Sequence, residues 1–252
     1  MRFGRNSTGG QSGRLYDSSS RFRKARKIAT ILETELESGL RNRVGLDVGC
    51  GNGAIAHYFK SCSKAFFGID SAHEFIGKFD TKDAFLLGGD GVELPFKDEA
   101  FDVVICAQVY EHAADAPGLV SEIRRVLKRD GVVFFSGPNK YSVIEDHYGL
   151  PFLSWFPRSL SSVIVRIFGK GQSYDESPKS LKELETLWKY FEIKDITHQI
   201  IANPTKFGLD REVRGMRWTS RIPVAILVAL RPLYPNYNWI LRKRLQNAGV
   251  DS

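Results

Sequence analysis

From residue 44 to residue 136, segments with the apolar pattern of strands alternate with segments that have the apolar spacing of helices. Short apolar runs of strand length occur five times, at residues 44–48, 65–69, 84–87, 101–107 and 131–136. Apolar residues with helical spacing lie before and between these runs, at residues 21–40, 54–60, 72–79 and 119–127. Strands that alternate with helices predict an α/β fold, in which helices cover both faces of a parallel sheet.

The last third of the chain follows a different pattern. Residues 149–170 form an apolar and aromatic insertion, after which Ser177 followed by Pro178 is typical of a helix start. We then expect a helix, a strand-like stretch and a closing strand, at residues 177–188, 191–201 and 237–241. The nine-residue apolar run 222–230 is too short to cross a bilayer, which needs about 20 apolar residues.

A glycine-rich loop joins the first apolar run to the following helix. Glycines alternate with other residues at Gly49, Gly51 and Gly53, and the acidic Asp47 lies two positions ahead of them. Glycines lack the Cβ atom that would keep a ligand away from the backbone, and the helix N-terminus beyond the loop favours an anionic group. The spacing differs from the Gly-x-Gly-x-x-Gly loop of dinucleotide-binding proteins.

Two further carboxylates are expected at strand ends. Asp70 ends the second strand about 20 residues beyond the loop, where an acidic residue can accept both hydroxyls of a ribose. Asp90 follows the third strand, where it can accept from the amine of adenine, with Gly91 beside it and Val92 available to pack on the ring. A helix cap or turn is the alternative role for each carboxylate, but three in this order indicate a nucleoside site.

These motifs resemble the class I S-adenosylmethionine-dependent methyltransferases, in particular the methyltransferase domain 11 group. The resemblance covers residues 44 to 139 and rests on five segments: Leu46-Asp47-Val48-Gly49-Cys50-Gly51, Gly68-Ile69-Asp70, Leu94-Pro95-Phe96, Ala100-Phe101-Asp102-Val103-Val104 and Glu122-Ile123-Arg124-Arg125-Val126-Leu127-Lys128. It implies a Rossmann-like sheet of seven strands with the last strand antiparallel. It also implies that Asp47 and the glycines hold the methionine part of the cofactor, Asp70 the ribose, and Asp90 with Val92 the adenine.

The family transfers a methyl group by direct displacement, so the protein mainly aligns the partners and excludes water. An acceptor hydroxyl would also need a base, for which the candidates are His112 and His147, after the fourth and fifth strands. Gln108 to His112 resembles the Glu-x-x-Glu-His segment of ubiquinone-pathway O-methyltransferases, which has been linked to a divalent cation. Gln108 replaces the first Glu of that segment, so we expect no metal and count Gln108 among the cofactor-binding candidates.

Residues 140–176 are expected to form a substrate lid. Its apolar residues and basic edges suggest a hydrophobic or lipid-linked acceptor, or contact with a membrane surface. The alternative is that Trp155 and its neighbours complete the core. The basic residues of the chain lie at its ends, with a net charge of +6 over residues 1–43, +6 over residues 203–252 and −5 between them.

The expected domain organisation is a flexible basic segment 1–20, a catalytic domain 21–202 and a basic extension 203–252 that completes the sheet. The expected function is methyl transfer to a small or lipid- or glycan-linked acceptor, on oxygen. RNA methylation is a weaker alternative, because stacking aromatics do not interleave with the basic ends. A non-catalytic binding adaptor is the other alternative. The polar N-terminal residues and three unpatterned cysteines favour the cytoplasm, at the inner membrane face if the apolar segments bind lipid.

Overall fold

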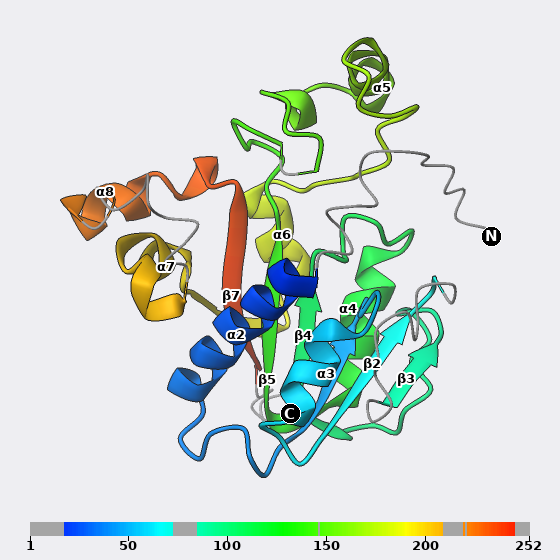
Figure 1. Cartoon of the computed structure of the whole chain (residues 1–252), viewed down its shortest axis with the longest axis vertical. Coiled ribbons are helices and arrows are strands. Elements are labelled where there is room, and N and C mark those ends of the chain that lie inside the picture. The colour runs from blue at the N-terminus through cyan, green and yellow to red at the C-terminus, as the bar shows by residue number, and fades with distance from the viewer. Residues whose placement is uncertain (1–17, 73–84, 146, 209–218, 220, 245–252) are drawn as a thin grey trace, which may run out of the picture.

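The computed structural model describes residues 18–72, 85–145, 147–208, 219 and 221–244 (Figure 1). Its centre is a seven-stranded sheet in the order β3-β2-β1-β4-β5-β7-β6, in which β7 runs antiparallel to both of its neighbours. The strands are β1 (Val44–Val48), β2 (Ala65–Asp70), β3 (Phe85–Gly88), β4 (Phe101–Ala107), β5 (Leu127–Pro138), β6 (Phe191–Asp195) and β7 (Asn236–Lys243). The predicted seven-stranded α/β fold is confirmed.

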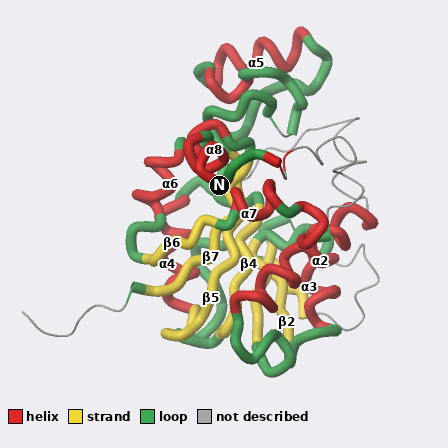
Figure 2. Tube along the Cα trace, turned by 90° about the vertical axis from the view of Figure 1, so that its left-hand side faces the viewer, coloured by secondary structure: helices red, strands yellow, loops and turns green. Residues whose placement is uncertain are grey.

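Helices pack on both faces of this sheet, as Figure 2 shows with α4 and α6 on one side and α2 and α3 on the other. The helices are α2 (Ser18–Glu35), α3 (Ala54–Lys60), α4 (Ala116–Val126), α5 (Arg158–Ile167), α6 (Leu181–Leu187), α7 (Thr197–Ala202) and α8 (Val224–Ala229), with short 3-10 turns η2 (Leu153–Trp155), η3 (Pro204–Phe207) and η5 (Arg231–Leu233).

Alternate residues of the central strands feed two separate cores. In β4, Val104 and Cys106 join the core under α4 and α6, while Val103 and Ile105 join the core under α2 and α3. Side chains of a strand point to opposite faces in turn, so a strand covered on both faces must be apolar throughout. All seven residues of β4 are buried, which explains why the strand is apolar apart from Asp102, whose carboxylate accepts from the Val44 N–H at 2.9 Å and pairs with Lys128.

Two predicted elements in the last third were wrong. Helix α6 begins after Ser180 instead of Ser177, because Ser180 and Glu183 form a capping box: the Ser180 N–H donates to the Glu183 carboxylate at 2.8 Å. The stretch 191–201 is not one strand. Strand β6 ends at Asp195, whose carboxylate accepts from the Thr197 N–H at 2.9 Å and turns the chain into α7.

Other predicted boundaries shift by a few residues. The first helix ends at Glu35, β5 extends from Leu127 to Pro138, and α4 begins at Ala116, where the Asp115 carboxylate accepts from the Gly118 N–H. The helix predicted over 72–79 lies outside the described residues except for its first position.

Residues 140–176, which we call the lid segment, stand beyond the sheet edge at which β4 and β5 end, and α5 lies farthest out (Figures 1 and 2). The segment has a small core of its own, made of Tyr148, Leu150, Leu153, Val165 and Tyr174. Trp155 does not complete a core as one interpretation held, because 42% of it is exposed. No helix among the described residues is long and apolar enough to cross a membrane.

Candidate active site

The loop between β1 and α3 depends on its three glycines. Gly49, Gly51 and Gly53 all have positive φ, at 72°, 56° and 82°. A Cβ on Gly49 would lie 2.5 Å from Val109, and one on Gly53 would lie 2.4 Å from Leu86. Larger residues would therefore be strained and would also collide with their neighbours.

Asp47 is buried at the start of this loop, with 2% of its surface exposed. Its Oδ2 atom has no hydrogen-bond partner among the described residues. Burial raises the pKa of Asp47 to about 7, although the charges of Lys24 and Arg21 act to lower it. A buried carboxylate oxygen that needs a donor fits the ammonium group of an amino-acid ligand such as the methionine part of the cofactor.

Asp70 at the end of β2 ties this loop to the next strand. Its carboxylate accepts from the Gly51 N–H at 2.7 Å and from the Ala72 N–H at 2.8 Å. Because the pairing order places β2 beside β1, Asp70 and Asp47 lie at the same edge of the sheet. The structure therefore brings together these two candidate cofactor residues.

Asp90 is an exposed residue in the turn after β3, the next strand along. Its carboxylate accepts from the Val92 N–H at 3.2 Å, and Val92 is half-buried against the core. A Cβ on Gly91 would lie 2.8 Å from Leu119, so this turn packs closely on α4. The adenine assignment of this turn stays a prediction.

Helix α2 supplies two basic residues that sequence reasoning missed. The Arg21 guanidinium lies 3.0 Å from where a Cβ on Gly51 would be, and Lys24 donates to the carbonyl of Ala107 at 3.4 Å. Burial lowers the pKa of Lys24 to about 8, with Lys27 and then Arg21 acting in the same direction. The signal was present in the three-residue spacing of Arg21 and Lys24, which places both on one face of the helix.

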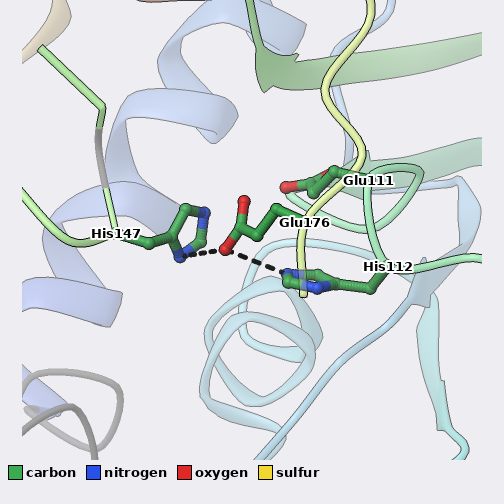
Figure 3. Close-up of side chains that lie close together, drawn as sticks. All are labelled: Glu111, His112, His147 and Glu176. Carbon is green, nitrogen blue, oxygen red and sulfur yellow. Dashed lines mark ion pairs between the residues drawn. The ribbon is translucent and has the colours of Figure 1, made fainter. Parts of the chain in front are cut away.

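A second group of side chains gathers at the end of β4, next to β1. Glu111, His112, His147 and Glu176 come from three loops, and one ligand-type atom of each lies within 4.8 Å of those of the others (Figure 3). The Nδ1 atom of His147 is 3.2 Å from a Glu176 carboxylate oxygen, and the Nε2 atom of His112 is 4.0 Å from the same oxygen. We call these four residues the His–Glu cluster.

The backbone around the His–Glu cluster is held by hydrogen bonds between distant segments. The Ser177 N–H donates to the carbonyl of Glu111 at 3.0 Å, which brings Glu176 to the end of β4. The Tyr110 hydroxyl accepts from the Lys179 N–H at 3.0 Å and donates to the carbonyl of Pro138. Both ends of the lid segment are thus fastened to the sheet edge.

The two predicted histidines lie together in the His–Glu cluster, with their ring centroids 5.7 Å apart. Burial, followed by the charges of His112 and Lys24, lowers the pKa of His147 to about 4. Its imidazole is therefore neutral near pH 7, and its Nε2 atom is buried without a hydrogen-bond partner among the described residues.

Gln108 lies at the end of β4 with a positive φ of 65°, which is rare for a residue with a side chain. Its amide group donates to the Asn236 side chain at 2.9 Å, at the start of β7. The side chain is therefore directed to β7 rather than to the His–Glu cluster, and its assignment to the cofactor stays a prediction.

The antiparallel β7, the glycine loop after β1 and the acidic residues that end β1 and β2 define a class I methyltransferase domain, whose cofactor is S-adenosylmethionine. Residues 46–135 match the profile of one family, described as the methyltransferase domain. The chain therefore contains a methyltransferase domain of this family. The orphaned Asp47 oxygen and the glycine cradle fit the cofactor.

Known proteins similar to this chain include methyltransferases with different acceptors. A tRNA (carboxymethyluridine(34)-5-O)-methyltransferase of Arabidopsis thaliana is 36% identical over 49% of this chain and 31% of its own length. A ubiquinone biosynthesis O-methyltransferase of Salmonella paratyphi A is 27% identical over 82% of this chain and 88% of its own length. The chain spans half or less of the first curated relatives that it matches.

Among solved structures, the plantazolicin methyltransferase BpumL, in complex with a monoazolic desmethylPZN analog and SAH, has a TM-score of 0.58. It is 18% identical, and the match covers 93% of this chain and 88% of that one. At this identity the likeness concerns the fold.

Proposed function

We propose that the chain transfers the methyl group of S-adenosylmethionine to an oxygen of an acceptor bound beneath the lid segment. The observation that carries this proposal is the position of the His–Glu cluster at the end of β4, beside the glycine loop at the end of β1. An acceptor at the cluster would be next to a cofactor held by the loop. In open α/β sheets ligands bind at this carboxyl edge.

The residues of the loop region would hold the cofactor by its charged and polar groups. Asp47 accepts from the ammonium, and the positive charges of Arg21 and Lys24 attract the carboxylate. Asp70 accepts from the ribose hydroxyls, while Asp90 with Val92 contacts the adenine. The bound cofactor supplies an activated methyl group, so the contribution of these residues is alignment and exclusion of water.

The acceptor side would be formed by the His–Glu cluster and the inner surface of the lid segment. A hydroxyl loses its proton when it is methylated, and His147 or His112 is placed to receive it. The apolar residues of the lid favour an acceptor with a hydrophobic part. The Salmonella relative, named as a ubiquinone biosynthesis O-methyltransferase, supports oxygen as the methylated atom.

Calorimetric titration with S-adenosylmethionine tests the cofactor part of the proposal. We expect micromolar affinity, and at least a tenfold loss in Asp70→Ala, which equals about 1.4 kcal/mol. Asp130→Ala is the control, because Asp130 is exposed in the amino-terminal half of β5, away from the loop. Equal affinities of the two variants would contradict the assignment of Asp70.

Transfer of labelled methyl from the cofactor to a lipid extract, phenolic compounds or tRNA tests the acceptor part. We expect His147→Ala and Trp155→Ala to reduce transfer while leaving cofactor affinity nearly unchanged, because His147 belongs to the His–Glu cluster and Trp155 lies in η2 of the lid segment. Normal turnover by both variants would contradict the placement of the acceptor under the lid.

RNA is a second candidate acceptor. The Arabidopsis relative is named as a tRNA methyltransferase, and both ends of this chain carry a net charge of +6. Basic segments attract phosphate in a salt-dependent manner. Transfer of the label to tRNA alone would show that RNA is the acceptor.

The lid segment and α8 also suggest attachment to a membrane surface that would deliver a lipid-linked acceptor. Their exposed apolar residues include Val163, Ile167, Phe168, Val224, Ile226, Val228 and Leu230. Arg166 and Lys170 flank the first group, and Arg221 and Arg231 the second. Apolar side chains that enter a bilayer edge contribute about 1.5–3 kcal/mol each at most, and each nearby basic residue adds about 1 kcal/mol on anionic lipid.

Co-sedimentation with anionic and neutral vesicles, at low and high salt, tests the attachment. We expect binding to anionic vesicles that weakens with salt and is reduced in Ile167→Ser, but not in the control Tyr190→Ser, an exposed aromatic between α6 and β6. Recovery in the supernatant under all four conditions would contradict it.

A further inference from the structure

We propose that Glu111, His112, His147 and Glu176 bind a divalent transition-metal ion. The site lies on the acceptor side of the proposed function, but the inference concerns binding of the ion and does not require turnover. It replaces the sequence-based expectation that the chain holds no metal.

The spacing of the four side chains is close to that of a metal site. In a tetrahedral site with ligand distances of about 2.0–2.2 Å, ligand atoms are about 3.4 Å from one another. Two of the observed distances, 3.2 and 4.0 Å, bracket this value, and all four atoms lie within 4.8 Å of one another. Small rotations of the side chains would complete such a shell, and Figure 3 shows them converging on one small volume.

The donor types select the class of ion. Two imidazole nitrogens and two carboxylate oxygens suit zinc, manganese, iron(II) or cobalt, whereas magnesium and calcium prefer oxygen ligands alone. The His147 imidazole presents its Nδ1 atom to a Glu176 carboxylate oxygen at 3.2 Å, so Nδ1 is the nitrogen that would bind the ion.

The charges of the cluster also favour a cation. Glu111 and Glu176 are 1% and 3% exposed, and their carboxylates lie together in one small site. Lys24 interacts favourably with Glu111, as a positive charge near this site would. Two buried carboxylates repel each other, so a divalent cation would stabilise this arrangement.

The backbone holds these ligands in place without a metal. Glu111 and His112 follow β4, His147 lies in the lid segment after β5, and Glu176 lies where that segment returns to α6. The hydrogen bond from the Ser177 N–H to the Glu111 carbonyl fixes the approach of Glu176. A bound ion would therefore link the lid segment to the sheet edge. An acceptor hydroxyl that took a fifth position on the ion would have a lowered pKa, and the two histidines would then act as ligands instead of as the base.

Titration of chelator-treated protein with zinc, manganese or cobalt chloride, without cofactor or acceptor, tests the inference. We expect one equivalent of at least one of these ions to bind with micromolar affinity, and cobalt to give a visible absorption band. His147→Ala and Glu176→Gln should each weaken binding at least tenfold. His198→Ala is the matched control, because His198 lies on α7, outside the cluster.

If the buried variants fail to fold, His112→Ala can be titrated instead, since 41% of the His112 side chain is exposed. It should likewise weaken binding of the ion at least tenfold. Absence of stoichiometric binding of all three ions, or equal affinities of the cluster variants and His198→Ala, would overturn the inference. Cofactor titration of the same metal-free protein separates this outcome from failure of the proposed function, because cofactor binding depends on the glycine loop.

Discussion

The proposed cofactor side and the proposed acceptor side of the sheet edge are built in different ways. The cofactor side consists mainly of residues at the ends of three successive strands, with the glycine loop fully contained in Asp47–Gly53. The acceptor side takes Glu111 and His112 from one loop, His147 from a second and Glu176 from a third. Residues at the ends of paired strands are held rigidly by the sheet, whereas a group of side chains from three loops depends on how the lid segment docks.

The two regions also differ in the cores that support them. The cofactor side rests on the sheet, whose two cores contain most of the buried apolar residues. The lid segment rests on a small cluster of five residues and leaves several aromatic and aliphatic side chains exposed. We therefore expect the lid segment to open locally at a lower free energy than the sheet unfolds.

The largest expected effect concerns stability, and it distinguishes the core of the sheet from the small core of the lid segment. Phe135 is fully buried, with its ring centroid 5.1 Å from that of Trp188 and 5.3 Å from that of Trp239. Phe135→Ala should lower the free energy of unfolding by about 3–5 kcal/mol, measured by urea denaturation. Leu153→Ala, at a fully buried position of the lid core, should lower it by less than about 1 kcal/mol, while hydrogen exchange of the lid becomes faster. Equal losses in global stability would show that lid and sheet unfold as one unit.

A smaller effect is expected on cofactor affinity, and it tests whether the glycine loop binds S-adenosylmethionine. Gly51→Ala should weaken binding of S-adenosylmethionine at least thirtyfold, about 2 kcal/mol, because the new Cβ would approach the Arg21 guanidinium and the residue has φ of 56°. Gly169→Ala imposes similar backbone strain, with φ of 62° and no atom within 4 Å of the new Cβ. Both variants should lose about 1–2 kcal/mol of stability. Loss of affinity in both variants alike would indicate a global effect of strain.

The smallest effect concerns the protonation of Asp47. Because burial raises its pKa to about 7, the carboxyl is mostly neutral at pH 5.5 and half ionised at pH 7. An ammonium group binds the ionised form, so cofactor affinity should rise roughly tenfold over this interval. Calorimetry at the two pH values measures it, and Asp47→Asn should show a flatter profile. The groups that face Asp47 are Lys24, Arg21 and Asp70, so the same slope in the variant would assign the effect to one of them.

The raised pKa of Asp47 also makes the stability of the fold depend on pH. The folded pKa of Asp47 lies above the unfolded value of about 3.9, so the folded state binds this proton more tightly. The contribution of Asp47 to stability is therefore present below pH 4 and is lost as the pH rises through 7. Asp47→Asn should remove this part of the pH dependence.

The central strands and the glycine loop could be predicted from the residues alone. Strand β4 and helix α3 begin and end where the apolar pattern predicts, because the pattern follows directly from which faces are buried. The glycine spacing was equally readable, since positive φ and close approach are properties of a few adjacent residues. The predicted start of α6 was wrong because it relied on Ser177 and Pro178, although the local capping-box pattern of Ser180 and Glu183 was also present in the sequence.

The side chains of the His–Glu cluster, in contrast, are brought together by the packing of distant segments. Neither periodicity nor spacing relates His147 to Glu176, which lie in different loops and are brought together by backbone hydrogen bonds at the base of the lid. The Arg21 guanidinium likewise reaches Gly51 only because α2 packs across α3 on the sheet. Contacts of this kind depend on the docking of distant segments, and their free energy comes from the buried cores rather than from the residues that meet.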